Sequence, residues 1–275
     1  MPELSSWDVV SGSGRGEVIL AVDFPAAGRP EANFTDLAEN MEAHWSQYSL
    51  LQTVPPAGRV DRNSPGQRYL WSWVEEIRAD GRPVAAVLGY CAGGVHAAAI
   101  AGEVGRWQRP VPQVILFDPQ VDARVLADEM CVQLQRMLSS LLPPDQAAEA
   151  KQKAADLAAA NVGDLFDLAD AVVGLFRQLA EPAFDRLGLS EAGRTHAVGL
   201  FQSFMSYLAV TARLDPSSAW KSSSAVLSAE YVAIAGQDPA ETGIFGRMVT
   251  VDASHADLLR SESTAQRVLE QMKNN

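Results

Sequence analysis

Two residues that lie far apart in the sequence have the chemistry needed for covalent catalysis. Cys91 stands at the centre of Gly89-Tyr90-Cys91-Ala92-Gly93, after an apolar run and before an alanine-rich stretch. This Gly-x-nucleophile-x-Gly pattern is typical of a sharp turn from a strand into a helix, where small neighbours are required. A cysteine thiolate attacks acyl carbon atoms, and the positive end of the following helix favours its charge. The pattern predicts that Cys91 is a nucleophile and that the Ala92 amide binds an oxyanion.

A base must accept the thiol proton, and His255 has the most suitable position among the four histidines. It follows an apolar run at 247–251 and precedes a final helix predicted over about 256–272. Loops at the carboxyl edge of a parallel sheet are where catalytic groups gather. The other histidines, His44, His96 and His196, fall within predicted helices. We therefore expect His255 to act as the base.

Two aspartates are candidates for the residue that orients the imidazole. Asp118 ends the apolar run at 113–117, and Asp238 follows a predicted strand at 230–235. Both precede a proline, and an aspartate before proline is also common in simple turns. Spacing alone leaves Asp118 and Asp238 open.

The elements that position these residues follow from hydrophobic patterning. Continuous apolar runs are typical of strands that are buried on both faces. Helices with apolar stripes are predicted between them, over 33–45, 64–80 and about 94–105. The alternation predicts an α/β fold class, with a mostly parallel sheet covered by helices on both faces. The predicted strands are 18–22, 48–54, 84–88, 113–117, 230–235 and 247–251.

The alternation stops between about residues 121 and 213. This stretch has no strand signal and contains amphipathic helical segments separated by prolines and glycines. It is too long for an irregular loop. We therefore predict one domain over 1–275 with a long helical insertion at about 121–213, which forms a lid over Cys91.

Composition limits the possible partners and compartments. The chain has 275 residues, 47% of them hydrophobic, and a formal net charge of −12. Such acidity argues against binding to nucleic acid or to an anionic membrane. With no signal peptide, no membrane span and two cysteines, Cys91 and Cys131, we expect a cytoplasmic protein with free thiols. Gly12, Gly14 and Gly16 precede a strand, so they do not predict a dinucleotide loop, and we expect neither a cofactor nor a metal.

The order of these features resembles the thioesterase family of nonribosomal peptide and polyketide synthases, which has the α/β-hydrolase fold. The resemblance rests on the 24–28 loop, the elbow around Cys91, an aspartate after the next strand, the helical insertion and the late histidine. It covers most of the chain. It implies that Asp118 is the acid and that the backbone N–H of Ala27, or of Ala26, is the second oxyanion donor.

The resemblance also implies a reaction and a partner. Family members take an acyl, peptidyl or polyketide chain from the phosphopantetheine arm of a carrier protein and release it by hydrolysis, cyclisation or aminolysis. Because carrier proteins are usually acidic, we expect weak docking through a local patch of arginine and lysine. Most members have serine at the elbow, so Cys91 is either a natural variant or an engineered replacement. The Met1 start favours a free-standing protein over a domain cut from a synthase.

Two other interpretations stay open. The elbow, cysteine included, also resembles that of dienelactone hydrolase, which acts on small esters and lactones and would favour Asp238 as the acid. The long insertion argues against this family. A non-catalytic binding protein with an α/β-hydrolase-like fold would require the pairing of Cys91 with His255 to be accidental.

Overall fold

The computed structural model of the chain describes residues 4–12, 16–25, 29–41, 45, 47–63, 66–160, 163–235 and 243–273. The chain divides into two compact units. The first unit comprises Met1–Val54, Leu70–Gln120 and Leu214–Asn275, and the second comprises Pro55–Tyr69 and Val121–Arg213. Cys91, Asp118 and His255 all belong to the first unit.

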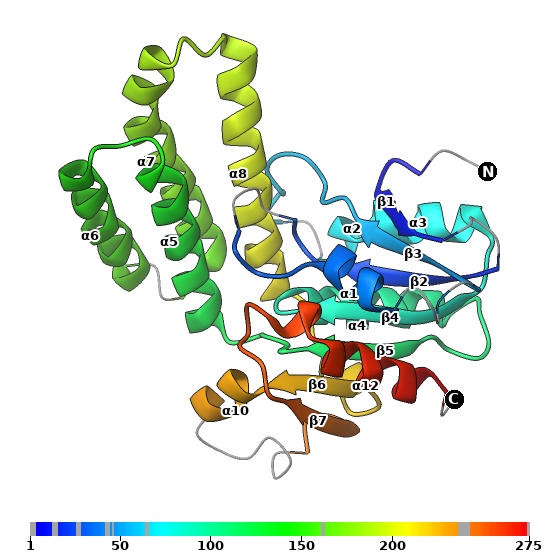
Figure 1. Ribbon diagram of the computed structural model, residues 1–275. Helices are drawn as coiled ribbons and strands as arrows, with labels where there is room; N and C mark the ends of the chain where they lie inside the picture. The colour runs from blue at the N-terminus through cyan, green and yellow to red at the C-terminus, as the bar shows by residue number, and fades with distance from the viewer. Residues whose placement is uncertain are drawn as a thin grey trace. The chain divides into compact units, whose positions relative to one another are not determined.

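Within the described residues, seven strands of the first unit form one sheet, in the order β1-β3-β2-β4-β5-β6-β7 (Figure 1). β1 is antiparallel to β3, and the other neighbouring strands pair in parallel. The carboxyl ends of β4, β5, β6 and β7 therefore meet at one edge of the sheet, where α/β proteins place their ligands. The strands are β1 (Trp7–Ser11), β2 (Glu17–Val22), β3 (Tyr48–Thr53), β4 (Val84–Tyr90), β5 (Gln113–Phe117), β6 (Ser224–Ser228) and β7 (Arg247–Val251).

The register of the central strands places two candidate residues side by side. Gly89 of β4 pairs with Leu116 of β5, and Tyr90 pairs with Phe117. Cys91 directly follows β4 and Asp118 directly follows β5, so the parallel pairing brings these two residues to neighbouring strand ends.

Helices cover both faces of the sheet, which explains why the central strands are apolar on both sides. On one face, α1 (Phe34–Met41) and α12 (Glu262–Lys273) contact each other and the short 3-10 helix η2 (Leu258–Arg260). On the other, α4 (Gly93–Val104) packs between α3 (Trp71–Asp80) and α9 (Ser217–Trp220). Along β4, Leu88 belongs to the core under α1, and Gly89 faces Ala97 of α4.

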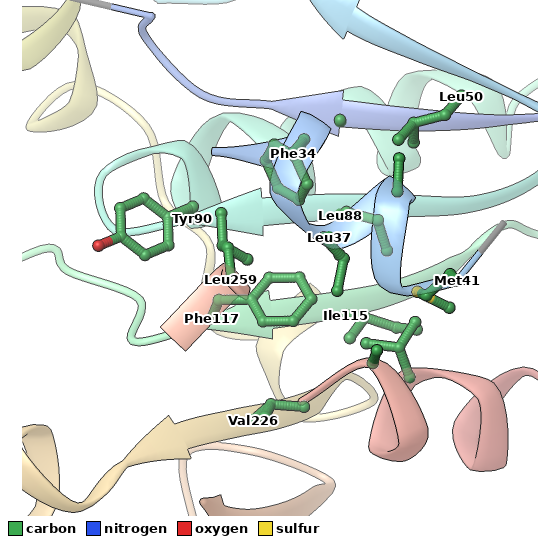
Figure 2. Packing of buried hydrophobic residues seen from close by; sticks show 14 of the residues in the cluster. Phe34, Leu37, Met41, Leu50, Leu88, Tyr90, Ile115, Phe117, Val226 and Leu259 are labelled. Atoms are coloured by element: carbon green, nitrogen blue, oxygen red, sulfur yellow. The ribbon is translucent and has the colours of Figure 1, made fainter. Parts of the chain in front are cut away.

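The core under α1 reaches the candidate site (Figure 2). Phe34, Leu37 and Met41 lie at helical spacing and point towards the sheet, and none of the three is measurably exposed. The ring of Phe34 meets that of Phe117 edge to face, with 5.9 Å between centroids. Tyr90, the residue before Cys91, is part of the same cluster and is 3% exposed.

The second unit is helical. It contains α2 (Gly66–Tyr69), α5 (Ala123–Ser139), α6 (Pro144–Ala160), α7 (Leu165–Arg186) and α8 (Glu191–Thr211). Asp122, Asp164 and Ser190 cap the starts of α5, α7 and α8 through their side-chain oxygens. Phe176 of α7 and Phe201 of α8 pack with 4.5 Å between ring centroids. The role of this unit as a lid stays a prediction.

The predicted strand at 230–235 is wrong. These residues belong to helix α10 (Ala229–Ala235), and the strand at this place in the sheet is β6, just upstream. Ser228 starts the helix, because its Oγ accepts the N–H of Tyr231 at 3.0 Å. The apolar run at 230–235 suggested a buried strand, but residues 230–234 are not buried, and Ile234 is 78% exposed. Asp238, which was placed at the end of this expected strand, lies outside the described residues.

Other elements differ in extent from the prediction. β1 was not expected; it is held by Trp7, whose Nε1 donates to the carbonyl of Trp73 at 3.0 Å. The last helix begins at Glu262 instead of 256, after η2. None of the helices in the described ranges combines the length and hydropathy that a bilayer-spanning segment requires.

Leu37→Ala should lower the free energy of unfolding by about 2–5 kcal/mol, because it leaves a cavity in the core under α1. Ile234→Ala is the matched control in the same unit, and at this exposed position the change should stay within about 0.5 kcal/mol. Urea unfolding measures both. Equal losses would contradict the burial of Leu37.

Candidate active site

Cys91 occupies a sharp turn between β4 and α4. Its φ is +50°, in the left-handed region that residues other than glycine rarely adopt. The Cys91 N–H donates to the carbonyl of Phe117 at 2.9 Å, and the Cys91 carbonyl accepts from Gly94 at 3.0 Å and from Gln120 at 3.1 Å. These bonds hold the strained backbone in place. The thiol is partly exposed and free of disulfide bonding.

The glycines of the elbow are required by close approach. A Cβ atom on Gly89 would lie 2.6 Å from the Cα of Gly94 and 2.8 Å from the Cβ of Ala97. A Cβ atom on Gly94 would lie 2.9 Å from the Cβ of Pro119. All three distances are shorter than carbon atoms tolerate, so α4 approaches β4 and Pro119 this closely because Gly89 and Gly94 have no side chains.

Of the two expected oxyanion donors, Ala92 and Ala27, the structure describes Ala92. Ala92 is the N-cap residue of α4, at the end of the helix where backbone N–H groups lack helical acceptors. Ala27, like Ala26, lies outside the described residues. The chain on both sides of them is anchored by Arg29, which donates to the Asp23 carboxylate at 2.8 and 2.5 Å and to the carbonyls of Phe24 at 3.0 Å and Ala32 at 3.1 Å.

Asp118 presents a buried carboxylate to His255. The Asp118 side chain is 0% exposed, and its Oδ2 lies 2.9 Å from His255 Nδ1. Ser228 donates its backbone N–H to Oδ1 at 2.7 Å and its hydroxyl to Oδ2 at 2.6 Å. A buried carboxylate needs such donors, and here they also fix its direction. Because Asp118 engages Nδ1, Nε2 is the nitrogen that remains for the thiol.

The pKa of His255 is raised from 6.5 to about 10. Burial, the largest effect, lowers this pKa, but hydrogen bonds between the imidazole and the side chains of Asp118 and Cys91, together with coulombic interactions with the same two groups, more than reverse it. The imidazolium form is therefore favoured at neutral pH. An imidazolium beside a cysteine is the arrangement that stabilises a reactive thiolate.

Two further residues hold His255. The ring of Tyr90 stacks on the imidazole with 4.8 Å between centroids and 20° between planes. The Tyr90 hydroxyl donates to the His255 carbonyl at 2.9 Å, and Glu230 Oε2 accepts the His255 N–H at 2.8 Å. Sequence reasoning gave neither residue a role, and it also missed Ser228. Glu230 falls within the wrongly predicted strand, and Ser228 ends β6, the strand that was missed. The only sequence signal for Tyr90 was its place beside Cys91.

The remaining candidates lie elsewhere. His96 is fully buried in α4, edge-on to the ring of Trp73, His196 lies in α8 of the second unit, and His44 is outside the described residues. Cys131 is buried in α5, and burial raises the pKa of its thiol. In the part of the chain that the structure describes, no group of three or more His, Cys, Asp or Glu side chains is arranged to hold a metal.

Comparison with known proteins identifies the fold. No family model matches the chain, and no curated protein matches it in sequence. A solved NocB thioesterase domain, in covalent complex with a fluorophosphonate nocardicin G analog, matches with a TM-score of 0.52 and 15% identity over 95% of this chain and 96% of that one. A carboxylesterase of the thaumarchaeon Nitrososphaera gargenis matches with a TM-score of 0.54 and 8% identity over 100% and 97%. The chain has the α/β-hydrolase fold.

A further structure of this α/β-hydrolase fold is the Vlm2 thioesterase domain bound with a dodecadepsipeptide, with a TM-score of 0.50 and 14% identity over 99% of this chain and 98% of that one. α/β-Hydrolases carry nucleophile, acid and histidine in that order along the chain. Here Cys91 follows β4, Asp118 follows β5 and His255 follows β7. The positions fit the fold, and the roles of the three residues stay predictions.

Asp118→Asn should lower the pKa of His255 from about 10, because the change removes a hydrogen bond and a charge that raise it and leaves the burial that lowers it. NMR titration of the imidazole signals, assigned with His255→Gln, measures the effect. Asp257→Asn is the matched control in the same loop, since the exposed Asp257 contacts Ser254 and Arg260. An unchanged pKa in Asp118→Asn would refute the coupling.

Proposed function

We propose that the chain is a thioesterase that releases an acyl, peptidyl or polyketide chain from a carrier-protein thioester, with Cys91, His255 and Asp118 as its catalytic triad. The observation that carries this proposal is the 2.9 Å contact between His255 Nδ1 and Asp118 Oδ2, which leaves Nε2 for the thiol. The same contact favours Asp118 over Asp238 as the acid, because it occupies the ring nitrogen that an orienting carboxylate must bind.

Acylation begins from the thiolate–imidazolium pair. Cys91 Sγ attacks the carbonyl carbon of the thioester, and the carbonyl electrons move onto oxygen. The Ala92 N–H, at the start of α4, and the Ala27 N–H stabilise this oxyanion. When the carbonyl re-forms, the bond to the pantetheine sulfur breaks, and His255 gives its Nε2 proton to the leaving thiolate.

Deacylation reverses the proton transfer. Neutral His255 removes a proton from water, or from an amine or hydroxyl of the acyl chain, as this nucleophile attacks the acyl-Cys91 carbonyl. The bond to Sγ then breaks, and the thiolate–imidazolium pair is restored. Water gives the free acid, and an internal amine or hydroxyl gives a cyclic product.

Other features support a large acyl substrate. Two of the solved structures with this fold are thioesterase domains, and one of them, Vlm2, is bound with a dodecadepsipeptide. A compact esterase that acts on small lactones does not require a second helical unit. In this chain, the residues of Val121–Arg213 form four long helices within the described ranges. We propose that this unit is the lid that shields the acyl-Cys91 intermediate from water.

Intact-mass spectrometry after mixing with acyl-carrier-protein thioesters tests the function. The wild-type protein should gain the mass of the acyl group, Cys131→Ala should gain it equally, and Cys91→Ala should not. Prior iodoacetamide treatment should block the adduct by alkylating Cys91 much faster than the buried Cys131. An adduct that survives in Cys91→Ala, or none across short acyl, long acyl and peptidyl thioesters, would refute the proposal.

Cys91→Ser should change the product as well as the rate. Attack by Cys91 exchanges one thioester for another, whereas serine forms an oxyester, which amines attack far less readily. With a substrate that carries a tethered amine, the wild-type protein should give a higher ratio of cyclised to hydrolysed product than Cys91→Ser. Chromatography of the products measures the ratio, and equal ratios would show that the cysteine does not favour cyclisation.

A further inference from the structure

The ring of Tyr90 forms the surface on which the His255 imidazole rests. Tyr90 ends β4, directly before Cys91, and is 3% exposed within the apolar cluster of Figure 2. Its ring is nearly parallel to the imidazole, at 4.8 Å, and its hydroxyl reaches the His255 carbonyl at 2.9 Å. Tyr90 therefore contacts both the ring and the backbone of His255.

Tyr90 is itself fixed by a buried ion pair. The guanidinium carbon of Arg29 lies over the Tyr90 ring, 5.3 Å from its centroid, a geometry that attracts a cation to an aromatic face. Arg29 is paired with Asp23, and their side chains are 12% and 5% exposed. The Ala32 N–H donates to the carbonyl of Ala256 at 2.7 Å, so the segment that holds Arg29 is also bonded to the residue after His255.

The bond to Asp118 does not fully orient the imidazole. A contact at one atom, Nδ1, leaves the ring able to tilt about that hydrogen bond, and tilting moves Nε2 relative to the thiol. A stacked ring opposes the tilt, and a tethered carbonyl opposes movement of the loop. Small displacements matter, because a misplacement of about 1 Å can cost about 100-fold in rate.

We propose that Tyr90 is a positioning residue that holds His255 at a constant distance from Cys91, an inference that rests on the proposed function. Because Tyr90 and Cys91 are consecutive, any shift of this strand end moves the nucleophile and the support of the base together. Burial raises the pKa of the Tyr90 phenol, so its hydroxyl stays protonated and remains a donor to the His255 carbonyl.

Three variants separate the contacts. Tyr90→Leu removes the stack and the hydroxyl and keeps an apolar side chain in the core. Tyr90→Phe removes the hydroxyl alone. Tyr231→Phe is the matched control, because the Tyr231 hydroxyl also donates to a backbone carbonyl at 2.9 Å, that of Pro119. The readouts are the NMR shifts of the His255 ring protons, assigned with His255→Gln, and kcat and KM for an acyl-pantetheine thioester.

In Tyr90→Leu, the His255 ring protons should move downfield as the ring current is lost, and kcat should fall about 10- to 100-fold with KM unchanged. Tyr90→Phe should keep the ring-current shift and lower kcat about 2- to 10-fold. Tyr231→Phe should leave the His255 signals in place.

Wild-type kcat in Tyr90→Leu, or His255 signals that do not move, would overturn the proposal. Should Tyr90→Leu not fold, wild-type kcat in Tyr90→Phe would overturn it instead. The NMR arm needs no substrate, so it separates this inference from the proposed function. If the wild-type protein does not turn over thioesters and Tyr90→Leu still shifts the His255 signals, the proposed function fails and the positioning contact is supported.

Discussion

The buried carboxylate of Asp118 is the group on which the rest of the site depends. A charge with no exposure is costly unless donors surround it, and here they come from Ser228 and His255. These donors tie the end of β5 to the end of β6 and to the loop after β7. The sheet therefore does more than carry the candidate residues. Its parallel register sets how far apart these strand ends lie, and the carboxylate holds them in that relation.

The features of the fold and the site that could be predicted from the sequence are those that depend on residues close together in the chain. The elbow around Cys91 could be predicted because its requirement for glycine is local: a Cβ atom on Gly89 would meet the backbone of Gly93 and Gly94. Strands β2, β4 and β5 could be predicted because burial on both faces gives unbroken apolar runs. β6 was missed because it is a short Ser-Ala-Val-Leu-Ser segment, and α10 was misassigned because none of its described apolar side chains is buried. The choice of Asp118 over Asp238 came from family resemblance. In the structure it rests on a contact across 137 positions, which no spacing reveals.

The arginines of the described residues bear on how a partner docks. In the second unit, Arg59 and Arg62 pair with Asp167 and Asp170 of α7, and Arg194 pairs with Glu181 and Asp185. In the first unit, a groove of about 700 Å³ is lined by Arg78, Arg82 and Arg109, at the amino ends of the strands and so at the opposite edge from Cys91. The arginines named here already have partners within their own units, so each of them would have to give up a contact in order to bind the acidic carrier protein of the proposed function. Weak docking, which the net charge of −12 leads us to expect, stays a prediction.

The left-handed backbone has an evolutionary consequence. Cys91 and Asp118 have φ values of +50° and +43°, and each costs about 1–2 kcal/mol that glycine would avoid. At both positions, glycine would relax the backbone and remove the side chain on which the proposed chemistry depends. If selection acted on folding stability alone, it would favour glycine at position 91. A lineage that keeps cysteine there is under selection for what the thiol does.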